Sequence, residues 1–95
     1  EAFSSAVETD PRLVHIYNRL GIAYRRQGKP LEGVKEYRKA LEFSPKEENL
    51  YFNLAVALVE GRKLSEAMGA LREAVKIRPD FSEAKELLQK LATAQ

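Results

Sequence analysis

Apolar side chains in this chain recur at the spacing of helix faces, and the whole pattern returns after 34 residues. The recurring pairs are Tyr17/Tyr51, Leu20/Leu54, Ala40/Ala74 and Pro45/Pro79. Self-similarity at a fixed period of this length is typical of helical repeat arrays, in which each repeat buries its apolar face on its neighbours. We therefore expect an all-α chain of stacked helices, one small domain within 95 residues.

The periodicity predicts helices over about 12–27, 30–43, 46–60, 64–77 and 80–93. Phe3, Ala6 and Pro11 precede Tyr37, Ala40 and Pro45 by 34 places. The register therefore divides the chain into four parts. These are the second helix of a truncated preceding repeat (1–11), two full repeats (12–45 and 46–79) and a C-terminal capping helix (80–95). It also predicts that the chain is a fragment of a longer protein.

Helix ends are marked by glycine, proline and capping residues. Gly28 and Gly61 should end the first and third helices. Two pairs, Ser44 with Glu47 and Asp80 with Glu83, have the spacing of capping boxes. Gly21 lies on the predicted packing face, where the lack of a side chain would let a partner helix come close.

The first and third helices each have a core face and an opposite face. On the first helix the core face holds Ile16, Tyr17, Leu20, Gly21, Ala23 and Tyr24. The opposite face of the third helix is itself apolar, with Phe52, Val56 and Val59. A helix that is apolar nearly all round is either buried on all sides or presents a binding surface. In the last helix, Lys85 and Gln89 replace the residues of a close helix contact, which is why we expect it to cap the array.

Composition and charge exclude several classes of function. The chain is 44% hydrophobic and 32% charged, and no apolar run approaches the roughly 20 residues needed to span a bilayer. Its net charge of +2 is too small to predict nucleic acid as the ligand. The absence of cysteine and of a recognisable signal peptide fits a cytoplasmic protein. One histidine, no glycine-rich phosphate loop and no metal-ligand cluster predict neither catalysis nor a cofactor or metal.

The repeat resembles the tetratricopeptide repeat family. Its pattern is matched by Tyr17, Leu20, Gly21, Tyr24, Gly33, Tyr37, Ala40 and Pro45, and in the second copy by Tyr51, Leu54, Ala55, Leu58, Ala67, Leu71, Ala74 and Pro79. The resemblance implies a solenoid of antiparallel helix pairs wound as a right-handed superhelix. The first helices of the pairs would line a concave groove that binds a peptide or helix of a partner protein.

The resemblance assigns the groove to the faces opposite the core. The residues are His15, Asn18, Arg19, Ile22, Arg25, Arg26, Asn49, Phe52, Asn53, Val56 and Val59. A basic area beside an apolar one would suit a ligand with apolar anchors and acidic neighbours. Family members that clamp acidic chaperone C-termini use Lys, Asn and Arg at slots held here by Asn18, Ile22, Glu83 and Leu87. Only Asn53 matches, so we expect no carboxylate clamp.

Two alternatives stay open at this point. The arginines are about as compatible with a solvated face as with an acidic partner, and Phe52, Val56 and Val59 could be covered by a neighbouring helix of the same chain. The chain could also be a structural element that stacks on other repeats, or on a second copy through exposed repeat ends.

Overall fold

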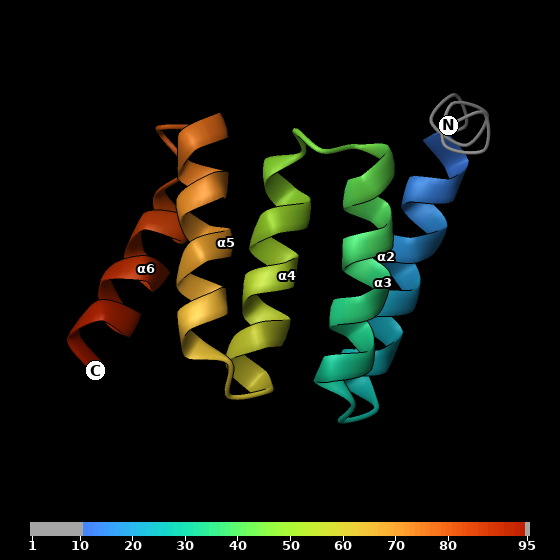
Figure 1. Cartoon of the computed structure of the whole chain (residues 1–95), viewed down its shortest axis with the longest axis horizontal. Helices are drawn as coiled ribbons and strands as arrows, with labels where there is room; N and C mark the ends of the chain where they lie inside the picture. The colour runs from blue at the N-terminus through green and yellow to red at the C-terminus, as the bar shows by residue number, and fades with distance from the viewer. Residues whose placement is uncertain (1–10, 95) are drawn as a thin grey trace.

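The computed structural model describes residues 11–94, and over this range the chain folds into helices stacked in sequence order (Figure 1). The helices are α2 (Pro11–Arg26), α3 (Pro30–Phe43), α4 (Glu48–Glu60), α5 (Leu64–Ile77) and α6 (Ser82–Ala94). Helices α2 and α3 form one pair and α4 and α5 the next, while α3 packs on α4 and α5 on α6. The expected all-α stack of helix pairs is confirmed. None of the helices within 11–94 has the length and apolarity to cross a membrane.

The bounds of α3 and α5 are those that the periodicity predicts. Helix α4 begins at Glu48 with Glu47 in the capping position and no side-chain cap, so the predicted Ser44–Glu47 capping box is wrong. Instead the backbone oxygen of Ser44 accepts a 3.4 Å bond from the N–H of Glu47. Helix α6 begins at Ser82, two residues beyond the Asp80 predicted to cap it. The predicted helix over residues 1–11 lies outside the described residues, apart from Pro11, which is the first residue of α2.

The core runs from α3 through α4 and α5 to α6, and its largest fully buried side chain, Tyr37, lies where α3 meets α2. Tyr37 is completely buried, and a Cβ placed on Gly21 would lie 2.5 Å from its ring. A Cβ on Gly33 would lie 2.8 Å from the backbone oxygen of Gly21. Both glycines are therefore required for the close approach of these two helices, as the sequence predicts for Gly21.

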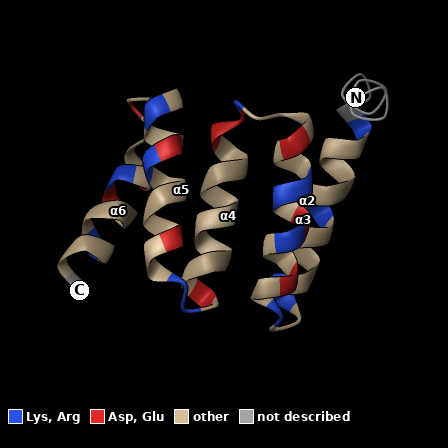
Figure 2. Cartoon of the chain, viewed as in Figure 1, with Lys and Arg blue, Asp and Glu red and all other residues tan. Residues whose placement is uncertain are grey.

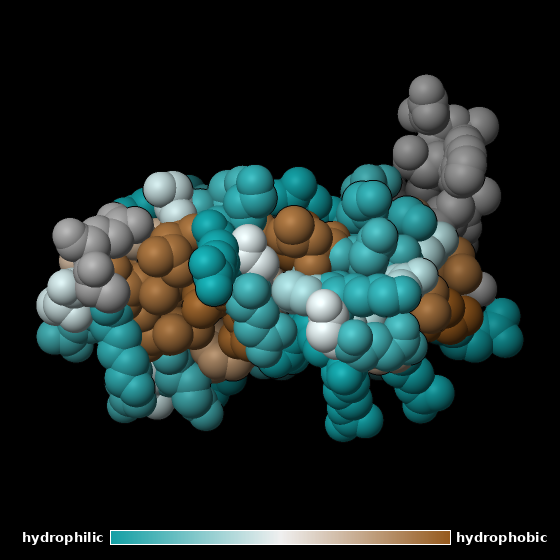
Figure 3. All heavy atoms as spheres, turned by 90° about the horizontal axis from the view of Figure 1, so that it is seen from below, coloured by the Kyte–Doolittle hydropathy of each residue, from teal (hydrophilic) through white to brown (hydrophobic). Residues whose placement is uncertain are grey.

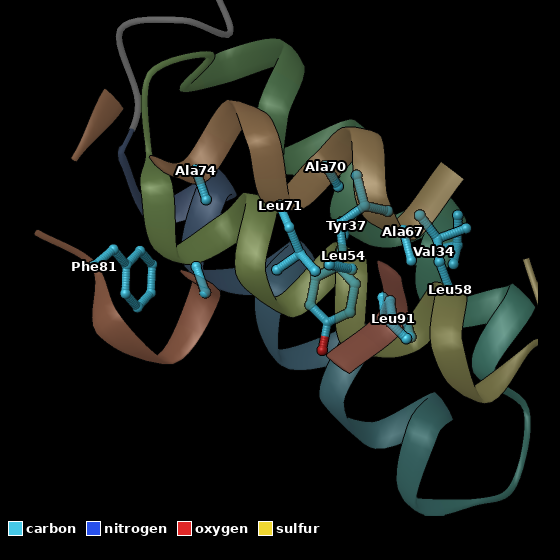
Figure 4. Packing of buried hydrophobic residues seen from close by; sticks show 13 residues of the cluster. Val34, Tyr37, Leu54, Leu58, Ala67, Ala70, Leu71, Ala74, Phe81 and Leu91 are labelled. Carbon is cyan, nitrogen blue, oxygen red and sulfur yellow. The ribbon is translucent and has the colours of Figure 1, made fainter. Parts of the chain in front are cut away.

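The second helix pair, α4 and α5, has side chains of different sizes at the corresponding positions. Ala55 and Ala67 stand where the first pair has Gly21 and Gly33, and the smaller Leu71 stands where it has Tyr37. All three are fully buried, and Figure 4 labels Ala67 and Leu71 within the core. Each repeat therefore keeps a close contact by matching a larger residue to a smaller neighbour, which conserves volume in a tightly packed interior.

Part of the predicted core is exposed. On α2 the side chains of Ile16 and Leu20 are 49% and 41% exposed, and Ala23 is also exposed, although the periodicity placed all three inward. Leu31 at the start of α3 is 45% exposed. The pattern identified the apolar face correctly but could not show which of its residues a neighbouring element covers. Conversely, Phe81 in the α5–α6 connection is buried without having been predicted.

The turns after α2 and α4 differ at one position. Gly28 has a φ of +78°, and Arg62, which follows it by one repeat, has a φ of +63°. Gly61, predicted to end α4, is its C-cap residue at a φ of −86°, so the left-handed conformation falls on the arginine. The left-handed conformation costs a residue with a side chain about 1–2 kcal/mol, whereas glycine adopts it without this cost.

We predict that Arg62→Gly stabilises the chain by about 0.5–1 kcal/mol, because relief of the left-handed strain exceeds the extra entropy of glycine in the unfolded state. Urea denaturation followed by circular dichroism would measure the change. The matched control, Gly28→Ala, should lower stability by a similar amount. A loss of stability in Arg62→Gly would contradict the prediction.

Candidate functional site

Two adjoining hollows between α2 and α4 share the side chain of Asn53, and seven of the eleven residues predicted for the groove line them. We call these two hollows together the α2–α4 groove. The larger, of about 490 Å³, is lined by Ile22, Arg25, Arg26, Asn53 and Glu60. The smaller, of about 180 Å³, is lined by Val14, His15, Asn18, Glu47, Asn49, Leu50 and Asn53.

An amide bridge separates the two hollows. Asn53 donates from Nδ2 to Oδ1 of Asn18 over 3.0 Å, and both side chains are half-buried. The residues are 35 positions apart, one more than the repeat, so the bridge joins the groove faces of successive repeats. Among residues 11–94, Nδ2 of Asn18 and Oδ1 of Asn53 have no protein partner, which leaves a donor and an acceptor side by side.

A bidentate ion pair lies in the lining of the larger hollow. Arg25 donates from Nε and from a terminal nitrogen to the two carboxylate oxygens of Glu60, each over 2.9 Å. These residues are also 35 positions apart. The hydrogen bonds from Arg25 hold the pKa of the Glu60 carboxyl below its usual range. Because both side chains are partly exposed, 26% and 42%, the pair contributes little to stability, but it neutralises one of the predicted groove cations.

The hydroxyl of Tyr37 lies near the guanidinium of Arg25. It is buried and makes no hydrogen bond within the described part of the chain. Burial raises the pKa of this hydroxyl, and the nearby Arg25 guanidinium partly offsets the rise. The aromatic side chain that fills the core between α2 and α3 therefore also lies close to the guanidinium of the groove.

The predicted apolar residues of α4 differ in how available they are. Phe52 packs on Phe81, with ring centroids 5.3 Å apart, and Phe52 and Val59 both lie against the core cluster. Val56 is half-buried and is not among the residues packed against that cluster. None of the three lines either hollow of the α2–α4 groove. Phe52 thus has a structural contact of its own, whereas Val56 presents apolar surface without one.

The cations of α2 also fall into different places. Arg19 and Arg26 are exposed and line a further hollow along α2, of about 570 Å³, with Ile22, Ala23 and Gln27. Arg26 also lines the larger hollow of the groove, and Arg19 does not. His15 and Asn49 are exposed at the edge of the smaller hollow.

The residues predicted for the groove include neither of its two carboxylates. Glu60 lines the larger hollow and Glu47 lines the smaller one, and both reduce the positive charge expected from the arginines. The sequence shows Glu60 as a charge at the end of the predicted third helix, but only the structure shows the offset of one repeat plus one residue that places it opposite Arg25. Helix α4 carries acidic side chains only near its two ends, so its middle is uncharged (Figure 2). Residues 11–94 hold no cluster of three or more His, Cys, Asp or Glu side chains that could bind a metal.

Comparison with known proteins identifies the repeat. A family model described as tetratricopeptide repeat matches residues 24–91. A curated Drosophila melanogaster protein, the BBSome complex member BBS4 homolog, is 23% identical over 86 residues. That match takes in 90% of this chain and 18% of the relative, so the chain spans about a fifth of its length.

Two solved structures extend the comparison. One is the TPR2AB-domain:pHSP90-complex of yeast Sti1, which this chain matches at a TM-score of 0.87 and 22% identity. The match covers 98% of this chain and 36% of the yeast chain. The first TPR of Spaghetti (RPAP3) bound to the HSP90 peptide SRMEEVD gives a TM-score of 0.46 at 20% identity, covering 90% of this chain and 94% of the other. With most of its length covered by the family model, the chain belongs to the tetratricopeptide repeat family.

Proposed function

We propose that this chain is a protein-interaction scaffold that binds a segment of a partner protein in the α2–α4 groove. The observation that carries the proposal is the Asn18–Asn53 bridge, because it presents an unpaired donor and an unpaired acceptor between two hollows. A peptide main chain offers the complementary pair, one C=O and one N–H, at every residue. The bridge can therefore hold a ligand backbone while the hollows on either side receive its side chains.

The surroundings of the bridge favour a ligand of mixed character. Ile22 is a half-buried apolar side chain that lines the larger hollow, and it suits a small apolar anchor of the ligand. Arg26 is exposed at the edge of the larger hollow and can pair with an acidic side chain. Arg25 is already paired with Glu60, so the acidic preference should be weaker than the count of arginines alone suggests.

Two further facts support a binding role. The yeast neighbour of similar fold is itself described in a complex with pHSP90, and the Drosophila relative is named as a member of a complex. The groove also lacks what a reaction needs: its one histidine is exposed, with no nucleophile paired to it within residues 11–94. Binding without chemistry is the function that this arrangement supports.

The test of the groove uses peptides that are selected from a random display library for binding to the whole chain. We predict that Asn53→Ala weakens binding of a selected peptide about tenfold, because about 1.4 kcal/mol is lost with the backbone hydrogen bonds. Ile22→Asp should weaken it further by placing a charge among the apolar anchors of the larger hollow. Fluorescence anisotropy of the labelled peptide measures both.

The matched control is Ser65→Ala, an exposed position at the start of α5, which should leave affinity unchanged. Circular dichroism checks that each variant keeps its helices. Peptides that bind Asn53→Ala and Ile22→Asp as tightly as the parent chain would refute the groove as the site.

We also propose that the groove is not a carboxylate clamp. Ile22 has no hydrogen-bond donor, Glu83 is an exposed carboxylate that repels another, and Leu87 packs against the core. A bound terminal carboxylate requires several converging donors or cations. Asn53 alone cannot supply them.

The expected affinity for the HSP90 peptide SRMEEVD is therefore a Kd of roughly 1 mM or weaker, equivalent to about −4 kcal/mol. Isothermal titration calorimetry measures it, with the yeast Sti1 domain and its pHSP90 ligand as the positive control. A Kd near about 1 μM, equivalent to about −8 kcal/mol, would show that a clamp exists.

A further inference from the structure

The two hollows of the α2–α4 groove carry opposite net charges. The larger hollow is lined by two arginines and one glutamate, and because Arg25 and Glu60 neutralise each other, Arg26 leaves it at +1. In the smaller hollow Glu47 is the one lining residue with a formal charge when histidine is neutral, which leaves it at −1. Neither Arg26 nor Glu47 has an ion-pair partner within residues 11–94. Both charges are therefore available to a ligand.

The smaller hollow offers acceptors for a cation. The side chain of Glu47 is exposed and makes no capping hydrogen bond to α4. The amide oxygen of Asn49 is a further acceptor, since this side chain is exposed and lines the same hollow. A lysine ammonium or an arginine guanidinium has hydrogen-bond donors only, so its chemistry complements these two side chains.

The larger hollow offers the opposite complement. Arg26 is exposed in the last turn of α2, and a guanidinium can donate two parallel hydrogen bonds to one carboxylate. Seen from the end at which α2 and α4 terminate, hydrophilic atoms predominate over α2 and α3, and the largest hydrophobic area lies toward α6 (Figure 3). The Arg26 end of the groove is therefore suited to an acidic side chain.

The bridge between the hollows favours an extended ligand. It presents a donor, Nδ2 of Asn18, beside an acceptor, Oδ1 of Asn53. In a helix the main-chain N–H and C=O groups bond to one another, whereas in an extended segment they are free to bond to such a pair. The occupant that matches the bridge is thus an extended segment that runs along the groove.

Helix geometry sets the distance between the two charges. Both hydrogen-bonded contacts across the groove are offset by 35 residues, so α2 and α4 run in the same direction and Glu47 lies level with position 12 of α2. Arg26 is about 14 residues further along, which corresponds to about 21 Å at about 1.5 Å per residue. An extended chain covers this distance with about six residues, at about 3.3 Å each.

We propose that the α2–α4 groove selects an extended segment of a partner protein with opposite charges at its two ends. A lysine or arginine of the segment pairs with Glu47, and an aspartate or glutamate about six residues away pairs with Arg26. Reversal of the segment would bring like charges together, so the two pairs also fix its direction. This inference rests on the proposed function and adds the charge, spacing and conformation of the partner segment.

The test repeats the random-peptide selection with three forms of the whole chain: the parent, Glu47→Lys and Arg26→Glu. Peptides selected by the parent should carry a basic and an acidic residue about six positions apart. Selection on Glu47→Lys should replace the basic residue by an acidic one and leave the other end unchanged. Selection on Arg26→Glu should replace only the acidic residue, by a basic one.

The affinity of one peptide from the parent selection gives a second measure. Glu47→Lys should weaken its binding about fivefold, because an exposed attraction becomes a repulsion of similar size. Changing the basic residue of the peptide to glutamate should restore the affinity for this variant. The loss should shrink as the salt concentration rises toward about 1 M, where the Debye length is about 3 Å.

Two matched controls separate pairing with the ligand from the general effect of a charge at a helix end. Glu83→Lys changes the acidic residue in the first turn of α6, and Lys76→Glu changes the basic residue in the last turn of α5. Both residues are exposed and line neither hollow of the groove. The two variants should leave the selected sequences and their affinities unchanged, and circular dichroism checks that every variant keeps its helices.

A charge preference that switches at one end in each groove variant, and in neither control, supports the proposal. Selection of the same charges by all three forms overturns it, and leaves the groove as the site if Asn53→Ala still weakens those peptides. If Asn53→Ala and Ile22→Asp bind them as tightly as the parent, the groove is not the site and the proposal fails with the proposed function. A preference that also switches in Glu83→Lys would show a general effect of charge and overturn the pairing with Glu47.

Discussion

The close contact between α2 and α3 is the constraint on which the rest of the structure depends. Tyr37 fills the space that Gly21 leaves, and Gly33 lets the backbone of the two helices approach. Protein interiors are packed densely enough that even one added methyl group must displace something. Since Tyr37 is completely buried, its ring has no free space into which to move. The separation and rotation of the first helix pair are therefore set by three side-chain sizes.

The groove is a consequence of this packing. With the core faces of α2 and α4 fixed by their partners, their opposite faces are brought side by side at an offset of one repeat plus one residue. The Asn18–Asn53 hydrogen bond and the Arg25–Glu60 ion pair both have this offset. The same geometry that buries Tyr37 places its hydroxyl near Arg25, so core and groove are coupled through one arginine.

Much of the fold could be predicted from the sequence, because a repeat gives the same information more than once. The bounds of α3 and α5, the burial of Tyr37 and the role of Gly21 follow from periodicity and residue size. The capping box at Ser44 failed because the chain forms a backbone turn before α4 begins. The exposure of Leu20 could not be predicted, because periodicity shows which face of a helix is apolar but not whether a neighbouring element covers it.

The candidate site was less predictable than the fold. The pattern brought Asn18 and Asn53 into one surface, but the bond between them depends on the offset between neighbouring helices. Phe52 was predicted as binding surface, and the structure stacks it on Phe81, a residue in a connection that has no periodic signal. Glu60 was visible as a charge at a helix end, and only the packing of α4 on the first pair shows that it opposes Arg25.

The most direct measurement of the central claim is the change in unfolding free energy for two glycine-to-alanine substitutions within helices. An added Cβ at Gly21 meets the Tyr37 ring, whereas at Gly69 in α5 it meets no atom within 4 Å. Gly69→Ala should stabilise the chain by about 1 kcal/mol, the usual difference in helix propensity. Gly21→Ala should destabilise it in spite of the same gain. Equal stabilisation by both substitutions would contradict the account.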